Sequence, residues 1–156
     1  MLFRSGLKQY EISNYAKPEY ACRHNVGYWT GVPYLGFGLG AASYLAGEQG
    51  ACRYRNTVDM AEYLRDSGEP AKLQRELQEL SPDDLCAEFM ILGLRMTGGV
   101  SAEEFRRRFG KPPEAVVGDV IEKHIGTGLL ARAGDRICLT RRGLSLANVV
   151  MRDFLG

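Results

Sequence analysis

The residues best suited to chemistry lie in CRHNVGYWTG, residues 22–31. This stretch holds His24, one of two histidines, beside Asn25, and continues with Tyr28 and Trp29, the only tryptophan. Imidazole is the usual protein ligand for haem iron, and grouped aromatic rings can enclose a flat apolar ligand. The stretch has neither helical nor strand periodicity, which predicts a loop. A histidine in a loop often makes only a structural hydrogen bond, so a ligand site and a packed turn both remain open.

A second candidate site is GFGLGAASYL, residues 36–45. Glycine removes the Cβ barrier between a backbone and a ligand, so a ligand can approach such a stretch closely. The stretch has no G-K-[ST] of a phosphate-binding loop, and its spacing departs from G-x-G-x-x-G. A tight bend or a bulge explains the same glycines without a ligand.

Composition indicates a globular chain with no strong electrostatic preference. The chain has 156 residues, 45% of them hydrophobic and 25% charged, with a formal net charge of +1. This length suits one domain or two small ones. No apolar run reaches the length of a membrane span, and the N-terminus lacks the apolar core of a signal peptide, so we expect no stable membrane insertion and a cytoplasmic location.

The four cysteines predict no metal site of their own. They are too far apart for a C-x-x-C pattern, and Cys86 and Cys138 stand in apolar contexts, where a free cysteine behaves as a small hydrophobe. Cys22 and His24 are at most half of a metal site, because no second pair of ligands stands nearby.

Periodicity and capping residues predict the elements, with a breaker at SGEP (67–70) that separates domains 1–67 and 68–156. In the first domain we expect a strand over 9–13, with Tyr10 and Ile12 on one face and Glu11 and Ser13 on the other, strands within 32–45 and 51–56, and a helix over 57–66 capped by Asn56 or Thr57. In the second domain we expect helices that start at Pro82, Ser101 and Pro113, a hairpin that joins 129–130 to 137–139, and a last helix from Thr140 to Phe154.

The order helix, helix, helix, hairpin, helix is close to that of a winged-helix module, which raises the hypothesis of DNA binding. The recognition helix would be residues 113–126. It offers Glu114, Asp119 and Glu122 against Lys123 alone, which opposes docking on a polyanion. We therefore expect no nucleic-acid partner and a packing or lid module instead.

Several segments together resemble the radical SAM proteins related to oxygen-independent coproporphyrinogen III oxidase. The segments are YEISNYAKPEYACRHNVGYW (10–29), GVPYLGFGLGAASYL (31–45), RYRNTVDMAEYL (53–64) and residues 81–110 and 128–155. The H-N-x-x-Y-W element resembles the haem-chaperone branch. The family's C-x-x-x-C-x-x-C motif, which holds a [4Fe–4S] cluster, is absent here, so the chain resembles only the C-terminal part of such a protein.

The resemblance implies an α+β fold: the terminal strands of a partial (β/α) barrel, followed by a helical winged-helix-like C-terminal domain. It also implies site residues. His24 would be an axial ligand of haem iron, and the pocket around it would be shaped by Asn25, Tyr28 and Trp29. The S-adenosylmethionine site would be bordered by Gly36, Gly38, Gly40 and Ala42. The carboxyl end of a barrel strand, where barrel enzymes place their chemistry, would carry Ser13, Asn14 and Ala16.

The implied function is a part in porphyrin biosynthesis or haem delivery, within an oxidoreductase-like family that uses S-adenosyl-L-methionine and a [4Fe–4S] cluster. Haem or a porphyrin is the expected ligand, and the chain alone is expected to be catalytically silent because the cluster ligands are missing.

A second hypothesis is a truncated interaction module, whose unpaired strand edges recruit the rest of the barrel or another copy. A winged-helix DNA-binding protein is the third.

Overall fold

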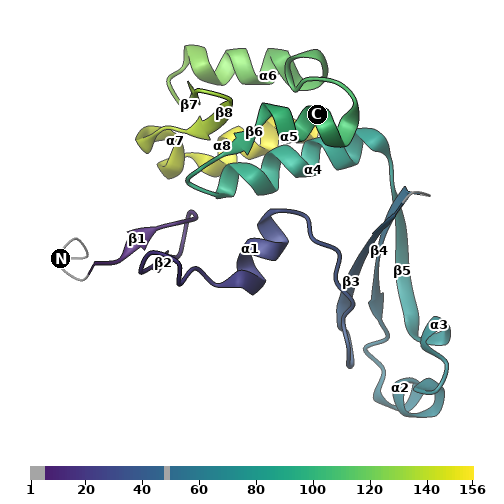
Figure 1. Cartoon of the computed structure of the whole chain (residues 1–156). Helices are drawn as coiled ribbons and strands as arrows, with labels where there is room; N and C mark the ends of the chain where they lie inside the picture. Colours follow the sequence, from purple (N-terminus) through teal and green to yellow (C-terminus); the bar gives the residue numbers. More distant parts are fainter. Residues whose placement is uncertain (1–5, 48–49) are drawn as a thin grey trace. The chain divides into compact units, whose positions relative to one another are not determined.

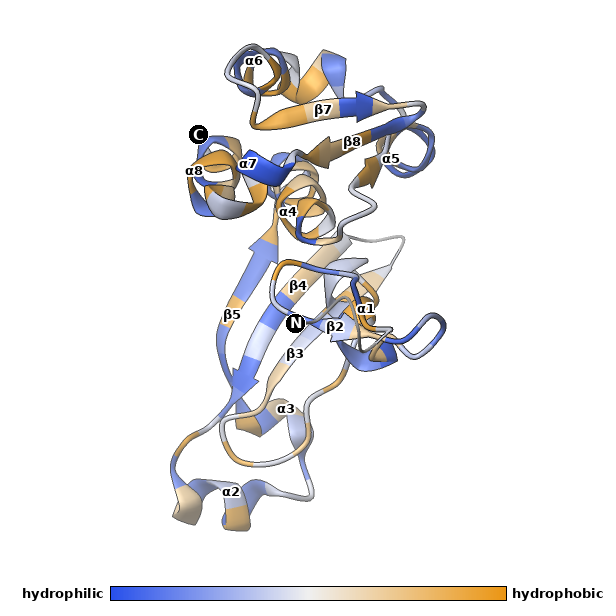
Figure 2. Ribbon diagram, turned by 90° about the vertical axis from the view of Figure 1, so that its left-hand side faces the viewer, coloured by the Kyte–Doolittle hydropathy of each residue, from blue (hydrophilic) through white to orange (hydrophobic). Residues whose placement is uncertain are grey.

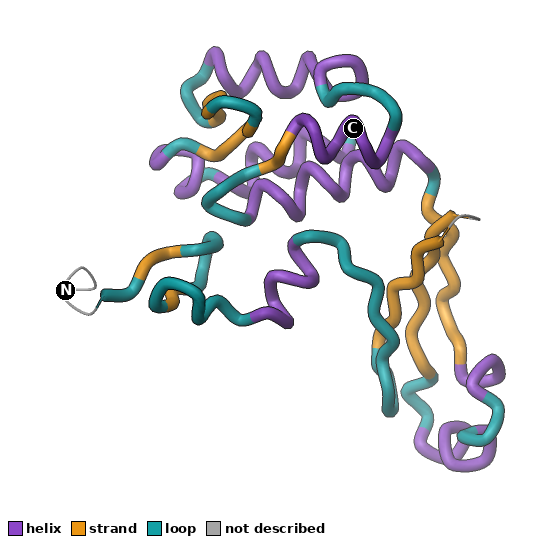
Figure 3. Tube along the Cα trace, viewed as in Figure 1, coloured by secondary structure: helices purple, strands orange, loops and turns teal. Residues whose placement is uncertain are grey.

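The computed structural model describes residues 6–47 and 50–156, which form two compact units. We call residues 6–31 with 83–156 the helical unit and residues 32–82 the sheet unit. Figure 1 labels their elements, and Figure 3 shows that both units contain helices and strands. The predicted α+β class is therefore confirmed.

The helical unit brings two distant parts of the chain together. Its elements are β1 (Lys8–Gln9), β2 (Tyr15–Ala16), α1 (Arg23–Trp29), α4 (Pro82–Arg95), β6 (Val100–Ser101), α5 (Ala102–Phe109), α6 (Glu114–Gly126), β7 (Leu130–Ala133), β8 (Arg136–Leu139), α7 (Arg141–Ser145), α8 (Ala147–Arg152) and a 3-10 helix η2 (Asp153–Leu155).

Helix α4 is the central element of this unit. It begins at Pro82 with two acids in its first turn, which favour a helix N-terminus, as predicted. Cys86, Met90 and Leu94 follow at four-residue spacing and are buried. Cys86 belongs to the apolar core, which confirms the prediction that it packs as a hydrophobe, and its burial raises the pKa of its thiol.

Helix α5 shows how local chemistry sets an element. The Ser101 hydroxyl accepts a hydrogen bond from the backbone N–H of Glu104 at 3.1 Å, which confirms the predicted cap. Phe105 and Phe109 lie one turn apart with ring centroids separated by 4.7 Å. The Phe105 side chain is fully buried, so the first turn of α5 is fixed to the core.

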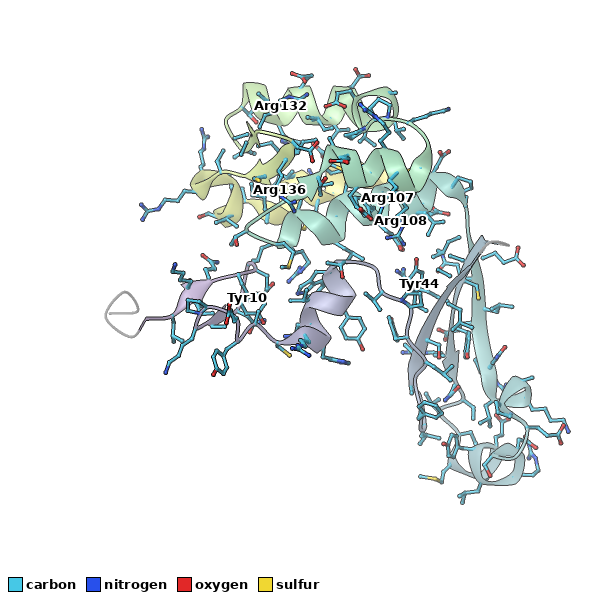
Figure 4. All side chains as sticks on the ribbon, viewed as in Figure 1. Tyr10, Tyr44, Arg107, Arg108, Arg132 and Arg136 are labelled. Carbon is cyan, nitrogen blue, oxygen red and sulfur yellow. The ribbon has the colours of Figure 1, made fainter. Side chains whose placement is uncertain are left out.

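The hairpin of β7 and β8 is confirmed, and β6 completes its sheet in the order β6-β8-β7. Arg132 of β7 lies beside α6 (Figure 4), within 2.6 Å of Glu114 and 2.7 Å of Glu122. The arginine neutralises two of the acids that would oppose binding to DNA. These carboxylates therefore serve packing of the hairpin against α6.

The core of the helical unit draws on nearly every helix and on the small sheet. Its buried members are Cys86, Met90, Leu94, Val100, Phe105, Ile121, Leu129, Leu130, Ile137, Leu139, Ala147, Val150, Met151 and Phe154. A contiguous apolar core of this kind is what lets a unit fold without outside support.

The C-terminal segment departs from the prediction of one helix. Thr140 caps α7 by accepting from the Gly143 N–H at 2.9 Å, as predicted. The helix then breaks at Leu146, whose backbone has φ −120° and ψ 24°, and α8 begins at Ala147. The break turns the buried Val150 and Met151 toward the core.

The sheet unit contains an antiparallel sheet in the order β3-β4-β5 and two short helices. Its elements are β3 (Ala42–Gly47), β4 (Gly50–Asn56), α2 (Met60–Asp66), α3 (Pro70–Leu73) and β5 (Gln74–Leu80). The predicted strand over 51–56 is confirmed.

Helix α2 is capped by Asp59, which accepts from the Glu62 N–H at 2.8 Å, so the predicted cap at Asn56 or Thr57 is wrong.

Many apolar side chains of the sheet unit face solvent. Phe37 is 85% exposed, and α2 shows its apolar positions in orange in Figure 2. The others are Val32, Leu35, Leu39, Leu45, Val58, Met60, Leu64 and Leu77. Apolar exposure on this scale is typical of a surface that another protein segment covers.

The strand predicted over residues 9–13 is only partly formed. Gln9 ends β1, Glu11 forms a single bridge with Met96, and a bend follows. Glu11 is fully buried, although the alternation predicts it on the solvent face with Ser13. The pattern fails because this carboxylate has an arginine partner, the half-buried Arg95, at a distant position that alternation cannot reveal.

Within residues 6–47 and 50–156, no helix combines the length and the apolar character needed to cross a bilayer.

A buried histidine ties α6 to the C-terminal end. His124 is 2% exposed, and its Nε2 lies 2.9 Å from Oδ2 of Asp153. Lys123 donates to the same oxygen at 2.7 Å. The hydrogen bonds from Lys123 and His124 hold the pKa of Asp153 below its ordinary value.

We predict that Asp153→Asn lowers the urea midpoint of unfolding at neutral pH. The folded pKa of Asp153 is lower than the unfolded one, so its stabilising effect is complete above about pH 5 and disappears as the pH falls through about 4 and below. The gap between variant and wild type, measured by circular dichroism, should close toward about pH 3. Asp119→Asn, an exposed carboxylate on α6, serves as the control; equal gaps at all pH values would contradict the prediction.

Candidate functional site

The residues CRHNVGYWTG form a helix, so the predicted loop is wrong. Helix α1 spans Arg23–Trp29, with Cys22 in extended conformation at its N-cap. Its seven residues are too few for a stable isolated helix, so tertiary contacts have to hold it. The contacts made by Trp29 are the strongest candidates.

His24 is exposed on α1, and its imidazole packs against Tyr28. The two ring centroids are 4.7 Å apart with the planes at 82°, an edge-on arrangement that orients the imidazole. Among the described residues, none makes a hydrogen bond to the His24 ring. An accessible imidazole oriented by a neighbouring ring fits the requirements of an iron ligand.

Trp29 lies on a different face of α1 from His24. The two residues are five positions apart, which corresponds to about 140° around a helix of 3.6 residues per turn. The Arg95 guanidinium lies over the Trp29 ring, with its Cζ 4.2 Å from the ring centroid. Of the predicted pocket residues, the structure therefore brings His24 and Tyr28 into contact and directs Trp29 toward α4. Asn25 lies between them in the helix and is half-buried.

Ser13, Asn14 and Ala16 lie in the same unit as α1, in and beside the turn between β1 and β2. The Ser13 N–H donates to Glu11 Oε1 at 2.8 Å, and the Asn14 carbonyl accepts from Tyr10 at 3.1 Å. Ala16 pairs with Lys8 across the two short strands. The segment is thus ordered by its own backbone, and its proposed place at the end of a barrel strand stays a prediction.

Gly36, Gly38, Gly40 and Ala42 lie in the sheet unit. A side chain at Gly36 would overlap the backbone carbonyl of Ala42, so this position requires glycine for packing. Gly38 has φ 108°, a backbone conformation that favours glycine. Asn56 donates through Nδ2 to the Gly38 carbonyl at 2.9 Å. The bend explanation accounts for these glycines, while the S-adenosylmethionine assignment stays a prediction.

Trp29 also lines a pocket of the helical unit. The pocket has a volume of about 630 Å³ and includes Tyr10, Phe89, Met96 and Arg136 in its lining. Figure 4 labels Tyr10 and Arg136, which come from the N-terminal segment and from β8. This volume lies within the range of small-molecule sites in proteins.

The sequence did not reveal Glu11 and Arg95 as site residues. Arg95 is the last residue of α4, and its Nη2 lies 3.6 Å from Oε2 of the buried Glu11. No short motif marks either residue, because they are 84 positions apart in the chain. Only the folded structure brings Glu11 and Arg95 together, with the Arg95 guanidinium also over the Trp29 ring.

Comparison with known proteins gives the relationship of the chain. A family profile described as the HemN C-terminal domain matches residues 80–146. "Heme chaperone HemW" of Lactococcus lactis is 35% identical over 99% of this chain and 39% of its own length. The protein of the same description from Bacillus subtilis is 34% identical over 97% of this chain and 39% of its own length.

The chain is a HemN/HemW-like C-terminal portion. It spans about 39% of the length of these two relatives. Among solved structures, coproporphyrinogen III oxidase (HemN) from Escherichia coli, titled a radical SAM enzyme, matches 98% of this chain and 38% of its own chain, with a TM-score of 0.69 and 17% identity. At that identity the match shows a shared fold.

The family implies S-adenosylmethionine and a [4Fe–4S] cluster in its full-length members. The residues present here do not fit the cluster: the sequence has no C-x-x-x-C-x-x-C, and the described residues contain no group of three or more metal-binding side chains. The four cysteines are free thiols, from exposed Cys22 to buried Cys86. The residues present do fit haem, because a haem iron needs one accessible imidazole as an axial ligand and His24 offers it.

We predict that Gly36→Ala destabilises the chain by about 1–3 kcal/mol, as expected when a methyl group is forced into closely packed backbone. The added methyl would overlap the Ala42 carbonyl at the start of β3. Urea unfolding measures the loss. Gly47→Ala is the matched control, because a side chain there meets open space; similar effects of both substitutions would contradict the packing role.

Proposed function

We propose that this chain supplies the haem-binding part of a radical SAM haem chaperone of the HemW type, with His24 as an axial ligand of haem iron. The observation behind the proposal is the exposed imidazole on α1, held edge-on by Tyr28. The relatives described as haem chaperones match the whole of this segment. Asn25 and Tyr28 would border the ligand, and Trp29 would fix the helix that presents it.

The fold assignment in this proposal has two parts. Residues 1–67 would complete a partial barrel whose larger portion belongs to the longer protein, with Gly36, Gly38, Gly40 and Ala42 beside S-adenosylmethionine. Residues 68–156 would contain a winged-helix-like domain, formed by the part from α4 onward. The order α4, α5, α6, β7, β8 and the pairing of β6 with β8 support the second part.

Haem supplies an iron that accepts a nitrogen ligand from the protein. The residues of this chain have to keep the imidazole exposed and oriented. Tyr28 orients the ring, and its position at i+4 from His24 makes that contact a property of the helix. We expect no catalysis from the chain alone, since the radical chemistry of the family requires the cluster.

A titration of the 156-residue chain with ferric haem tests the proposal. The wild type should shift the Soret band, and His24→Ala should lose that shift with an affinity lower by about tenfold or more, a change of about 1.4 kcal/mol or more. His124→Gln is the matched control, because His124 is buried against Asp153 and is not accessible to iron. An unchanged Soret band and affinity in His24→Ala would contradict the assignment.

We also propose that the sheet unit is a docking surface for the remainder of the longer protein. Its exposed apolar residues and the 61% of the relatives' length outside this chain support that partner. Strand edges of β3 and β5 offer backbone groups for pairing.

Without that remainder, we expect the chain to self-associate, and Phe37→Ser to weaken the association because Phe37 is 85% exposed. Light scattering over a concentration series measures this. Tyr20→Ser, at an 80% exposed aromatic of the helical unit, should leave the association unchanged. A monomer at every concentration would contradict the docking surface.

A further inference from the structure

The buried carboxylate of Glu11 has no functional assignment so far. Its side chain is 0% exposed, and an isolated carboxylate is costly to bury, so a partner has to compensate its charge. Oε1 accepts from the Ser13 N–H at 2.8 Å. Oε2 has no hydrogen-bond partner among the described residues, and its nearest cation is Arg95 Nη2 at 3.6 Å.

Arg95 connects this carboxylate to the helix that bears His24. The guanidinium lies over the Trp29 ring at 4.2 Å, a favourable arrangement for a cation and an indole. The Trp29 Nε1 is buried without a hydrogen-bond partner among the described residues, so Trp29 is held by the arginine and by packing. One side chain thus contacts both the N-terminal segment and α1.

The backbone around Arg95 reinforces the same connection. The Arg95 carbonyl accepts from the Ile12 N–H at 3.0 Å, and the Thr97 N–H donates to the Tyr10 carbonyl at 3.1 Å. These bonds flank the bridge between Glu11 and Met96. The end of α4 therefore acts as a short strand partner for the segment that precedes α1.

From this arrangement we infer that Arg95 is a positioning residue for the proposed haem site. Glu11 fixes the guanidinium, the guanidinium fixes Trp29, and Trp29 fixes the orientation of α1 and so the direction in which His24 faces. This inference rests on the proposed function of His24. Arg95 touches no ligand in this arrangement; it acts through Trp29.

Trp29 is the only tryptophan, so its fluorescence reports on the connection without haem. Arg95→Met should move the emission to longer wavelength and increase acrylamide quenching several-fold, because the indole loses its cover. The same variant should bind ferric haem several-fold more weakly, while the Soret maximum of the saturated complex stays at the wild-type position because His24 still ligates.

Arg95→Lys is the conservative variant. It keeps a positive charge beside Glu11 but loses the planar group that stacks on the indole. We expect partial recovery of haem affinity and of Trp29 protection relative to Arg95→Met. If Arg95→Met unfolds because Glu11 is left without a counter-charge, the double variant Glu11→Gln with Arg95→Met removes that charge and gives the same two readouts.

Arg53→Met is the matched control. Arg53 lies over the Tyr44 ring at 5.3 Å in the sheet unit, so its removal deletes an arginine–aromatic pair that does not include Trp29. Trp29 emission and haem affinity should stay at wild-type values in this control.

Wild-type Trp29 emission and quenching in Arg95→Met would overturn the anchoring. Exposure of Trp29 with unchanged haem affinity would overturn the positioning role while leaving His24 as the ligand. A failure of the His24 assignment is a separate result: the Soret response would then survive in His24→Ala, whatever the fluorescence of the Arg95 variants shows.

Discussion

A carboxylate removed entirely from water needs a cation beside it, and Glu11 finds that cation 84 residues away at Arg95. This requirement determines which parts of the chain form the helical unit. Residues 6–31 contribute little to the apolar core, yet they belong with residues 83–156, because the pair and two flanking backbone hydrogen bonds join them to the end of α4. Glu11 is fully buried whereas the Arg95 side chain is 26% exposed, so loss of the arginine would leave a buried carboxylate without its counter-charge, which is destabilising.

The two units differ in how they are stabilised. The helical unit has a contiguous apolar core, whereas the sheet unit leaves many large apolar side chains in solvent. The proposed docking of the remainder of a longer protein would account for this difference, because it would cover the exposed apolar side chains of the sheet unit. The proposed ligand residue His24 belongs to the unit that is complete in itself.

Local chemistry made much of the helical unit predictable from the sequence. The start of α4, the Ser101 cap, the phenylalanine pair and the β7–β8 hairpin depend on residues close in the chain, and His24 was recognisable by its rarity and its aromatic neighbours. Elements that depend on distant partners were missed or assigned wrongly. The residues of β5 are mostly charged or polar, with Leu77 and Leu80 at helical spacing, so their pattern does not indicate a strand. They form one because β4 pairs with them. Helix α1 and buried Glu11 likewise depend on Arg95, which no motif marks.

Native-state hydrogen exchange at two amides tests the central connection most directly. The Ile12 and Thr97 N–H groups donate across the junction between the N-terminal segment and the end of α4. If the Glu11–Arg95 pair closes this junction, both amides exchange as slowly as those of the helical core and open together with it. Exchange of both at the rate of exposed loop amides, while the amides of α4 stay protected, would contradict the account.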